Sequence, residues 1–304
     1  MVSVRLLLAA LLAGGAGPVA QTPAPSPPAA DTSSRPMPDE RQFLAEARTR
    51  LASNDLIQVR FSFRERTTEL KLNPFGRTMG TGPANTYEVY PHPQEEMTYR
   101  RLIERDGRPV SANDLAEQDR DYRDKLDAWQ RRLAKEGTSE RVERLRKIAE
   151  TRKKDEAMAN EALDLFDFHV VGRETWDNEP AIVVTFTPRP GAAPRSREGR
   201  IAKAFSGRAW IHEFDHEVMN VEATAVDDVS FGWGMIAKIY KGSSARFTRR
   251  HISGAWLPVE TRFDGSGRAI MVRKVDIDFK RDYFDYQPYD ITELPARLGW
   301  VTAP

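Results

Sequence analysis

The stretch that decides the fold runs from residue 209 to residue 226 and reads AWIHEFDHEVMNVEATAV. Both of its ends are rich in strand-forming residues, and apolar and polar side chains alternate after residue 218. A period of two is typical of a half-buried β-strand. The segment FDHE at 214–217 favours a tight turn between the two ends. The stretch therefore predicts two antiparallel strands joined in a hairpin.

The same stretch contains His212, Glu213 and His216, which match the pattern H-E-x-x-H. In zinc peptidases the two histidines of this pattern lie one helical turn apart and bind the metal, while the glutamate activates a water molecule. The strand-forming residues on both sides favour the hairpin, so we expect exposed turn residues here. A zinc metallohydrolase that uses His212, Glu213 and His216 is the less favoured alternative.

Outward from this stretch, the strand pattern continues in both directions. Phe61 and Phe63 alternate with polar residues, and Asp106-Gly107 is a hairpin signal. From residue 166 to residue 283, short strands follow one another with turns between them. Strands in this order favour an antiparallel sheet over a parallel one.

Residues 112–163 differ from the rest because they combine a high charge density with a helical period. One apolar stripe runs through Leu115, Tyr122, Leu126, Trp129 and Leu133. Gly137-Thr138-Ser139 ends this helix and begins a second one. We expect a charged helical hairpin, which is either a solvated insertion packed by one face or a surface for a protein partner.

The N-terminus has the pattern of a secretory signal peptide over residues 1–20, with Arg5 before the apolar residues 6–13. Cleavage is expected between Ala16 and Ala20. Residues 21–38 are rich in Pro, Ala, Ser and Thr, which predicts a disordered linker. The folded domain is expected at 39–295, and the mature protein is expected to be exported in soluble form to the periplasm or beyond the cell.

Charge and cysteine content exclude several classes of protein. The chain has 46 Lys and Arg against 45 Asp and Glu, a net charge of +1, which argues against a nucleic-acid binder. It has no cysteine, which excludes disulfides and thiol nucleophiles. No apolar run reaches the ~18–20 residues of a membrane-spanning helix.

Several segments resemble one known superfamily. Residues 207–211, the acidic turn after them, and residues 221–223 resemble the late strands of LolA/LolB-like proteins, which are periplasmic lipoprotein carriers, acceptors and envelope sensors. Residues 86–90, 105–109, 227–232, 241–243 and 256–258 are similar to a secreted subgroup, the outer-membrane lipoprotein-sorting proteins. The resemblance covers residues 43–286.

The resemblance implies an α+β fold in which a strongly curved antiparallel sheet, an incomplete barrel, is covered by helices. It implies a periplasmic, non-enzymatic carrier of an apolar ligand, such as a lipoprotein acyl chain or a lipid. An envelope interaction or sensing module on the same fold is the alternative, with an envelope protein bound by the helical hairpin. No catalytic residue, cofactor or metal ligand is expected.

A wide curved sheet has more apolar inner surface than its own side chains fill, so a ligand cavity is expected there. The candidate cavity residues are Phe61, Phe63, Val89, Val184, Phe186, Trp210, Val221 and Phe247. Their alternative role is plain core, and a period of two does not say which face of the sheet each one occupies. Phe231 and Trp233, two aromatic residues among glycines, are expected either at the cavity mouth or in the core.

Overall fold

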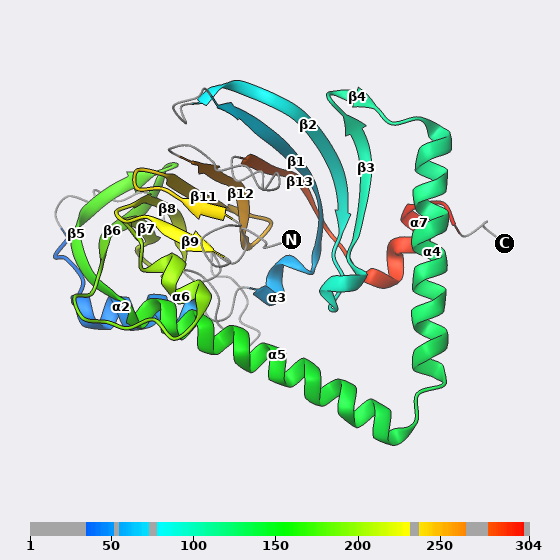
Figure 1. Ribbon diagram of the computed structural model, residues 1–304, viewed down its shortest axis with the longest axis horizontal. Helices are drawn as coiled ribbons and strands as arrows, with labels where there is room; N and C mark the ends of the chain where they lie inside the picture. The colour runs from blue at the N-terminus through cyan, green and yellow to red at the C-terminus, as the bar shows by residue number, and fades with distance from the viewer. Residues whose placement is uncertain (1–34, 52–54, 73–77, 232–236, 266–278, 301–304) are drawn as a thin grey trace.

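The computed structural model describes residues 35–51, 55–72, 78–231, 237–265 and 279–300 (Figure 1). Its main feature is one antiparallel sheet of eleven strands in the order β4-β3-β2-β1-β13-β12-β11-β8-β7-β6-β5. β4 and β5 are its two edges, so the sheet is open, and Figure 1 shows that it is curved. The predicted fold class, an α+β incomplete barrel, is confirmed.

The strands of this sheet are β1 (Phe61–Leu72), β2 (Thr78–Tyr90), β3 (Tyr99–Arg105), β4 (Arg108–Pro109), β5 (Phe166–Trp176), β6 (Glu179–Pro188), β7 (Phe205–His212), β8 (Val218–Ala225), β11 (Ser244–Ile252), β12 (Ala255–Asp264) and β13 (Phe279–Pro288). A separate pair is formed by β9 (Val229–Phe231) and β10 (Ala237–Ile239). The α-helices are α2 (Glu40–Leu51), α3 (Asp55–Gln58), α4 (Ala112–Ala134), α5 (Thr138–Asp164), α6 (Arg197–Ala202) and α7 (Leu294–Arg297). The short 3-10 turns are η2 (Glu95–Met97) and η3 (Ile291–Glu293).

Two-residue turns join β3 to β4 and β5 to β6, and the first is the turn that Asp106-Gly107 predicts. The φ angles are 52° and 73° at Asp106 and Gly107, and 50° and 67° at Asp177 and Asn178. Positive φ at both central residues is the requirement of the tight hairpin turn whose twist matches that of the strands, and Asn, Asp and Gly meet it at the lowest cost. These two turns therefore fix the register of their hairpins.

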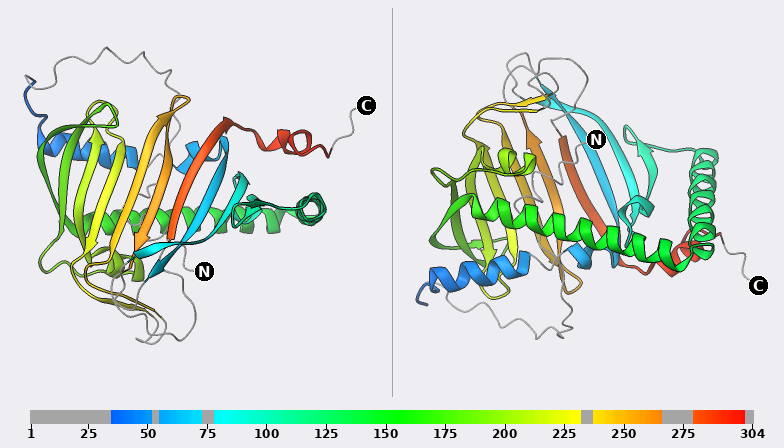
Figure 2. Two further views of the ribbon diagram at one scale, coloured as in Figure 1. Left: turned by 90° about the horizontal axis from the view of Figure 1, so that it is seen from above. Right: turned by 60° about the horizontal axis from the view of Figure 1, so that its bottom comes forward.

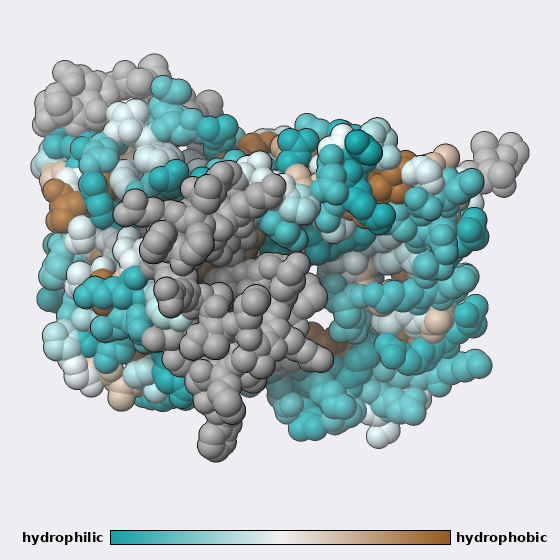
Figure 3. Space-filling model, turned by 45° about the horizontal axis from the view of Figure 1, so that its top comes forward, coloured by the Kyte–Doolittle hydropathy of each residue, from teal (hydrophilic) through white to brown (hydrophobic). Residues whose placement is uncertain are grey.

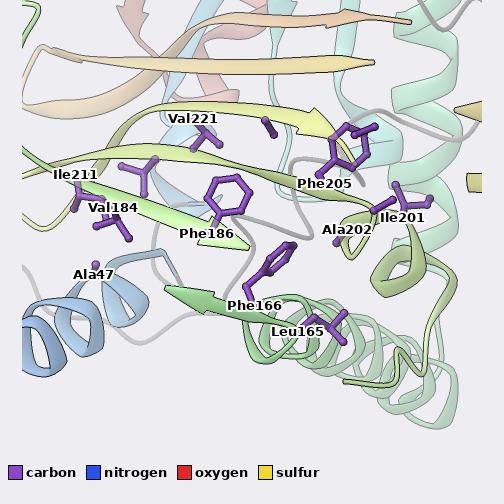
Figure 4. Packing of buried hydrophobic residues seen from close by; sticks show 14 of the residues in the cluster. Ala47, Leu165, Phe166, Val184, Phe186, Ile201, Ala202, Phe205, Ile211 and Val221 are labelled. Carbon is purple, nitrogen blue, oxygen red and sulfur yellow. The ribbon is translucent and has the colours of Figure 1, made fainter. Parts of the chain in front are cut away.

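The two faces of the sheet carry two separate clusters of buried side chains. We call the side toward which Val184, Phe186 and Val221 point the Val184 face. On this face α2, α6 and the end of α5 add Phe43, Ala47, Leu165, Ile201 and Ala202 to the cluster (Figure 4). The opposite side, the Trp210 face, holds Ala181, Val183, Trp210, Met219 and Trp256.

Helix α2 begins directly after Asp39, a residue type that commonly caps helices. The carboxylate of Asp39 accepts a hydrogen bond from the backbone N–H of Gln42 at 2.8 Å, which satisfies a donor in the first turn. Phe43 and Ala47, four residues apart, are both buried against the sheet. Arg48 lies 3.1 Å from Asp164 at the end of α5, so the two helices are also joined by an ion pair.

Helices α4 and α5 form close to the predicted bounds, but they do not pack side by side as a hairpin. They diverge from the turn between them, and α5 runs across the strands of the sheet while α4 stands beside β3 (Figure 2). α4 packs on β3, where the Tyr122 and Tyr99 rings stack at 4.2 Å and Asp119 pairs with Arg101 at 2.9 Å. Hydrophilic side chains dominate the surface on the α4 side of the molecule (Figure 3). No helix among the described residues is long and apolar enough to cross a membrane.

Side chains bond to the backbone at both ends of the sheet, on β5 and on the part of β3 that the two-residue strand β4 does not cover. On β3, the side-chain amide of Gln118 from α4 accepts from the N–H of Leu102 at 2.8 Å and donates to its carbonyl at 3.1 Å. On β5, the carboxylate of Glu40 from α2 accepts from the N–H of Val170 at 3.0 Å. Helices α4 and α2 are therefore bound to opposite edges by backbone-directed hydrogen bonds.

Gly207 on β7 provides a test of the close packing on the Val184 face. A Cβ at this position would lie 2.0 Å from the Glu222 carbonyl oxygen and 2.8 Å from the Phe186 ring. We expect Gly207→Ala to lower the free energy of unfolding by about 1–3 kcal/mol or more, because neighbouring backbone has to move. Urea denaturation measures this change. Gly172→Ala is the control, since nothing lies within 4 Å of its Cβ position.

Some predicted features lie outside the described residues. These are the signal peptide at 1–20, the linker up to residue 34, Trp233, and residues 266–278 of the predicted run of strands.

Candidate functional site

One continuous row of side chains crosses the Val184 face. Residues paired across neighbouring strands point to the same face and lie ~4.5–5.5 Å apart. The pairings place the following residues side by side, from β2 to β5: Asn85, Thr67, Arg281, Thr261, Phe247, Val221, Ala209, Val184 and Val170. The row is polar at its β2 end and apolar at its β5 end.

The apolar half of the row is covered by helices. Val184 and Val221 are buried in the cluster to which α2 and α6 contribute (Figure 4). Phe186, one step along β6, meets Phe166 edge-on at 5.4 Å and is also buried. The burial of these apolar side chains stabilises the packing of the helices on the strands.

Phe247 lies in the middle of the row, next to Val221 of the cluster to which the helices contribute. Its strand neighbours Val221 and Thr261 are buried, with 4% and 7% of their surface exposed, but Phe247 itself is only partly buried. An apolar ring therefore remains accessible between the helix-covered half and the polar half.

The polar half centres on β1. Glu65 is almost fully buried, and its carboxylate accepts from Nη2 of Arg100 at 2.5 Å and from the Thr67 hydroxyl at 3.0 Å. The Arg100 guanidinium also lies 4.6 Å from the centre of the Tyr87 ring, a cation–π contact. These partners hold a buried negative charge in place on the same face as the apolar cluster.

Arg281 of β13 stands between the two halves. Its guanidinium lies 5.1 Å from the centre of the Phe279 ring, which belongs to the apolar cluster, and its Nε is 3.8 Å from the Glu65 carboxylate. Nε is buried but makes no hydrogen bond. On the other side of Thr67, the side-chain oxygen of Asn85 is also buried without a hydrogen bond.

The candidate cavity residues of the sequence analysis are placed as follows. Val184, Phe186 and Val221 lie together in one cluster, and Phe247 is in their row. Phe63 and Val89 are paired across β1 and β2 on the same face and are buried. Phe61 is buried in a smaller cluster with Ala255 and Leu257.

Trp210 differs from the other candidates because it points to the opposite face. It pairs with Val183, lies 4.9 Å from the Trp176 ring, and donates from Nε1 to Glu174 at 2.8 Å. The alternation of side chains along β7 explains this, since Ala209 and Ile211 on either side take the Val184 face. Phe231, at the end of β9, and Trp233 remain predictions for the mouth of a cavity or for the core.

The predicted hairpin at 214–217 is confirmed, because β7 ends at His212 and β8 begins at Val218. The expected exposure is wrong, since His212 is 7% exposed and the side chains of Glu213 and His216 are 9% and 19% exposed. Glu213 makes a bidentate pair with Arg173, at 2.6 and 3.0 Å. His216, at a φ of 58°, turns toward α2, where its Nε2 lies 3.0 Å from the Glu46 carboxylate. The backbone N–H of Asp215 donates to Nδ1 of His212 at 3.0 Å.

This geometry does not fit the zinc alternative. The pattern is not on a helix, so His212 and His216 do not share one helix face, and Glu213 is held by Arg173. Among the residues that the structure describes, no group of three or more His, Cys, Asp or Glu side chains could hold a metal ion.

The turn gives a pH prediction through Asp215. The adjacent His212 side chain, together with the Trp256 Nε1–H that donates to the carboxylate at 3.0 Å, lowers the pKa of Asp215 to about 2 from an ordinary 3.8. A lowered pKa means that the ionised carboxylate stabilises the fold above about pH 4, and that this contribution disappears as the pH falls toward 2. The difference in unfolding free energy between the native chain and Asp215→Asn should therefore shrink over that range. A difference that stays constant from pH 6 to pH 2 would contradict this prediction.

Sequence reasoning did not find Arg281, Thr67 or Asn85. They come from strands far apart in the chain and form no motif. The alternation of side chains around residue 281 indicates which residues share a face with Thr67 only when the pairing of β13 with β1 is known.

The chain is similar to several solved structures at low sequence identity. No protein-family model and no curated protein matches the chain. It is similar to the solved structure of a LolA superfamily protein from Nitrosomonas europaea, with 11% identity, a TM-score of 0.25, and coverage of 84% of this chain and 96% of that chain.

Two further solved structures are similar to this chain. One is a putative outer membrane lipoprotein-sorting protein domain from Vibrio parahaemolyticus, with 7% identity, a TM-score of 0.30, and coverage of 84% of this chain and 96% of that chain. The other is a DUF1329 family protein from Desulfovibrio piger, with 11% identity, a TM-score of 0.28, and coverage of 85% and 96%.

Proposed function

We propose that this protein is a non-enzymatic binding or carrier protein for an apolar ligand, such as a lipid or a lipoprotein acyl chain. The observation that carries the proposal is the partly exposed Phe247 ring in the middle of a continuous row on an open sheet. A ligand chain that covers this ring extends the apolar cluster beyond the helices. Each buried methylene contributes ~0.8 kcal/mol, so an acyl chain can be held without polar chemistry.

The proposal is tested by binding of a fluorescent fatty-acid probe and by mass spectrometry of lipid that co-purifies. We expect Phe247→Gln to weaken probe binding about tenfold, because a polar amide replaces an apolar contact surface. Val171→Gln is the matched control, since Val171 is an exposed apolar residue on the edge strand β5. Equal binding by the two variants, or no binding by the native chain, would refute the proposal.

We also propose that the chain is exported and processed. The supporting observation is the signal-peptide pattern at residues 1–20. The mass of the protein recovered from the periplasmic fraction is expected to correspond to cleavage between Ala16 and Ala20. An uncleaved chain in the cytoplasm would contradict this.

A second candidate function is envelope interaction or sensing through α5. Val142 and Leu145, three residues apart at the start of this helix, are 61% and 50% exposed. An apolar pair on a charged, exposed helix favours contact with a partner protein. The double substitution Val142→Glu with Leu145→Glu should then abolish cross-linking to an envelope protein and leave fatty-acid binding unchanged. Retention of the same partner by the double variant would exclude this role.

A further inference from the structure

Two unmatched buried polar atoms lie on either side of Thr67 on the Val184 face. They are Nε of Arg281, a hydrogen-bond donor, and the side-chain oxygen of Asn85, an acceptor. Thr67 pairs with both residues, so they are its direct neighbours across β13 and β2. A buried polar group without a partner costs free energy, which a ligand group that bonds to it would recover.

The negative charge nearest to Arg281 is already bonded to other groups. The Glu65 carboxylate accepts from Arg100 at 2.5 Å and from Thr67 at 3.0 Å, whereas Nε of Arg281 remains 3.8 Å away. Arg281 has about a quarter of its side chain exposed. Its guanidinium is thus a charged donor that is held in place, partly desolvated and incompletely bonded.

The surroundings of Arg281 are amphipathic. Its guanidinium lies over Phe279 of the apolar cluster, and the row leads from Arg281 through Thr261 to Phe247. Neighbouring strands are ~4.7–4.9 Å apart, so Arg281 and Phe247 are separated by about 10 Å. A cation and an accessible aromatic ring at this spacing match a molecule with a charged head and a chain.

We propose that Arg281 binds the anionic head, a carboxylate or a phosphate, of an amphiphile whose acyl chain lies over Phe247. This rests on the proposed function and deepens it, because it specifies an anionic amphiphile rather than a neutral one. The planar guanidinium suits such oxygen pairs, and hydrogen bonds to charged groups are the strong ones. Asn85, on the far side of Thr67, accepts from a hydroxyl or amide donor on the head.

The test compares two probes with the same chain, the sixteen-carbon fatty acid and the sixteen-carbon alcohol, by isothermal titration below the micelle concentration. The variants are Arg281→Leu and, as a control that removes the same charge, Lys280→Leu, whose side chain points to the opposite face. Arg281→Lys keeps the positive charge but loses the planar guanidinium, which can bond to two oxygens of one carboxylate or phosphate. Circular dichroism confirms that each variant is folded before binding is measured.

The native chain is expected to bind the acid at least tenfold more tightly than the alcohol. Arg281→Leu should weaken acid binding about tenfold and leave alcohol binding unchanged, Arg281→Lys should recover part of the preference, and Lys280→Leu should bind as the native chain does. Equal affinity for both probes, or equal effects of Arg281→Leu and Lys280→Leu, overturns the head site and leaves the proposed function standing. Failure to bind either probe overturns both.

Discussion

Replacing Arg249 with methionine is expected to lower the free energy of unfolding by about 3–5 kcal/mol, because the buried Glu217 carboxylate would lose the charged hydrogen bond from the guanidinium. Nη1 of Arg249 lies 2.9 Å from the Glu217 carboxylate, and 6% and 10% of the two side chains are exposed. Nη2 also donates to the Trp256 carbonyl at 2.6 Å. The guanidinium therefore joins β11 to the start of β8 and to β12.

The adjacent residue provides the control. Arg250 pairs with Asp177 at 2.7 Å, but more than half of its side chain is exposed. Arg250→Met should cost less than about 1 kcal/mol, since water screens such a pair. The double variant Arg249→Met with Glu217→Met removes both buried charges and should be more stable than Arg249→Met alone. Similar losses for Arg249→Met and Arg250→Met in urea denaturation would show that the buried pair does not matter.

The second large effect is expected for Phe186→Ala, with a loss of about 3–5 kcal/mol in the free energy of unfolding. Phe186 is 1% exposed, and its ring centre lies 5.4 Å from that of Phe166. Its ring also fills the space next to Gly207, where a Cβ would lie only 2.8 Å away. Truncation removes apolar contacts and leaves a cavity among strands that are fixed by their register. The surrounding backbone is unable to collapse into that space without breaking pairings, so the cost should lie at the upper end for such a change.

Phe214→Ala is the matched control for this second prediction. The side chain lies in the turn after β7 and is 48% exposed, so its truncation should cost less than about 1 kcal/mol. Thermal unfolding followed by circular dichroism compares the two variants with the native chain. If Phe186→Ala melts as Phe214→Ala does, the Val184 face is not the main core of the sheet.

Local features of the fold were predictable from the sequence because their causes are local. The Asp39 cap, the Asp106-Gly107 turn and the hairpin at 214–217 each depend on residues within a few positions of one another. The relation of α4 to α5 was not predictable in the same way. Their charged surfaces offer many ion pairs of similar energy, and the sequence does not say that Tyr122 will stack on Tyr99 of β3 instead of packing against α5.

The candidate site was predictable only in part. The apolar residues of β6 and β8 were found because alternation marks them, but the face of Trp210 depends on the register with β6. The polar end of the row was missed because Thr67 and Arg281 are more than two hundred positions apart. Isolated polar residues in strands are ordinary, and their meaning arises only when pairing brings them next to each other.

The hydrogen bonds of Gln118 and Glu40 have a consequence for how this chain behaves at high concentration. An open sheet has two edges (its rims) whose unpaired backbone groups could pair with a strand of another molecule. Such pairing leads to aggregation and fibre formation. Here a side-chain amide occupies Leu102 on one rim and a carboxylate occupies Val170 on the other. A strand from another copy would therefore have to displace these side-chain bonds to pair with the sheet at Leu102 or Val170.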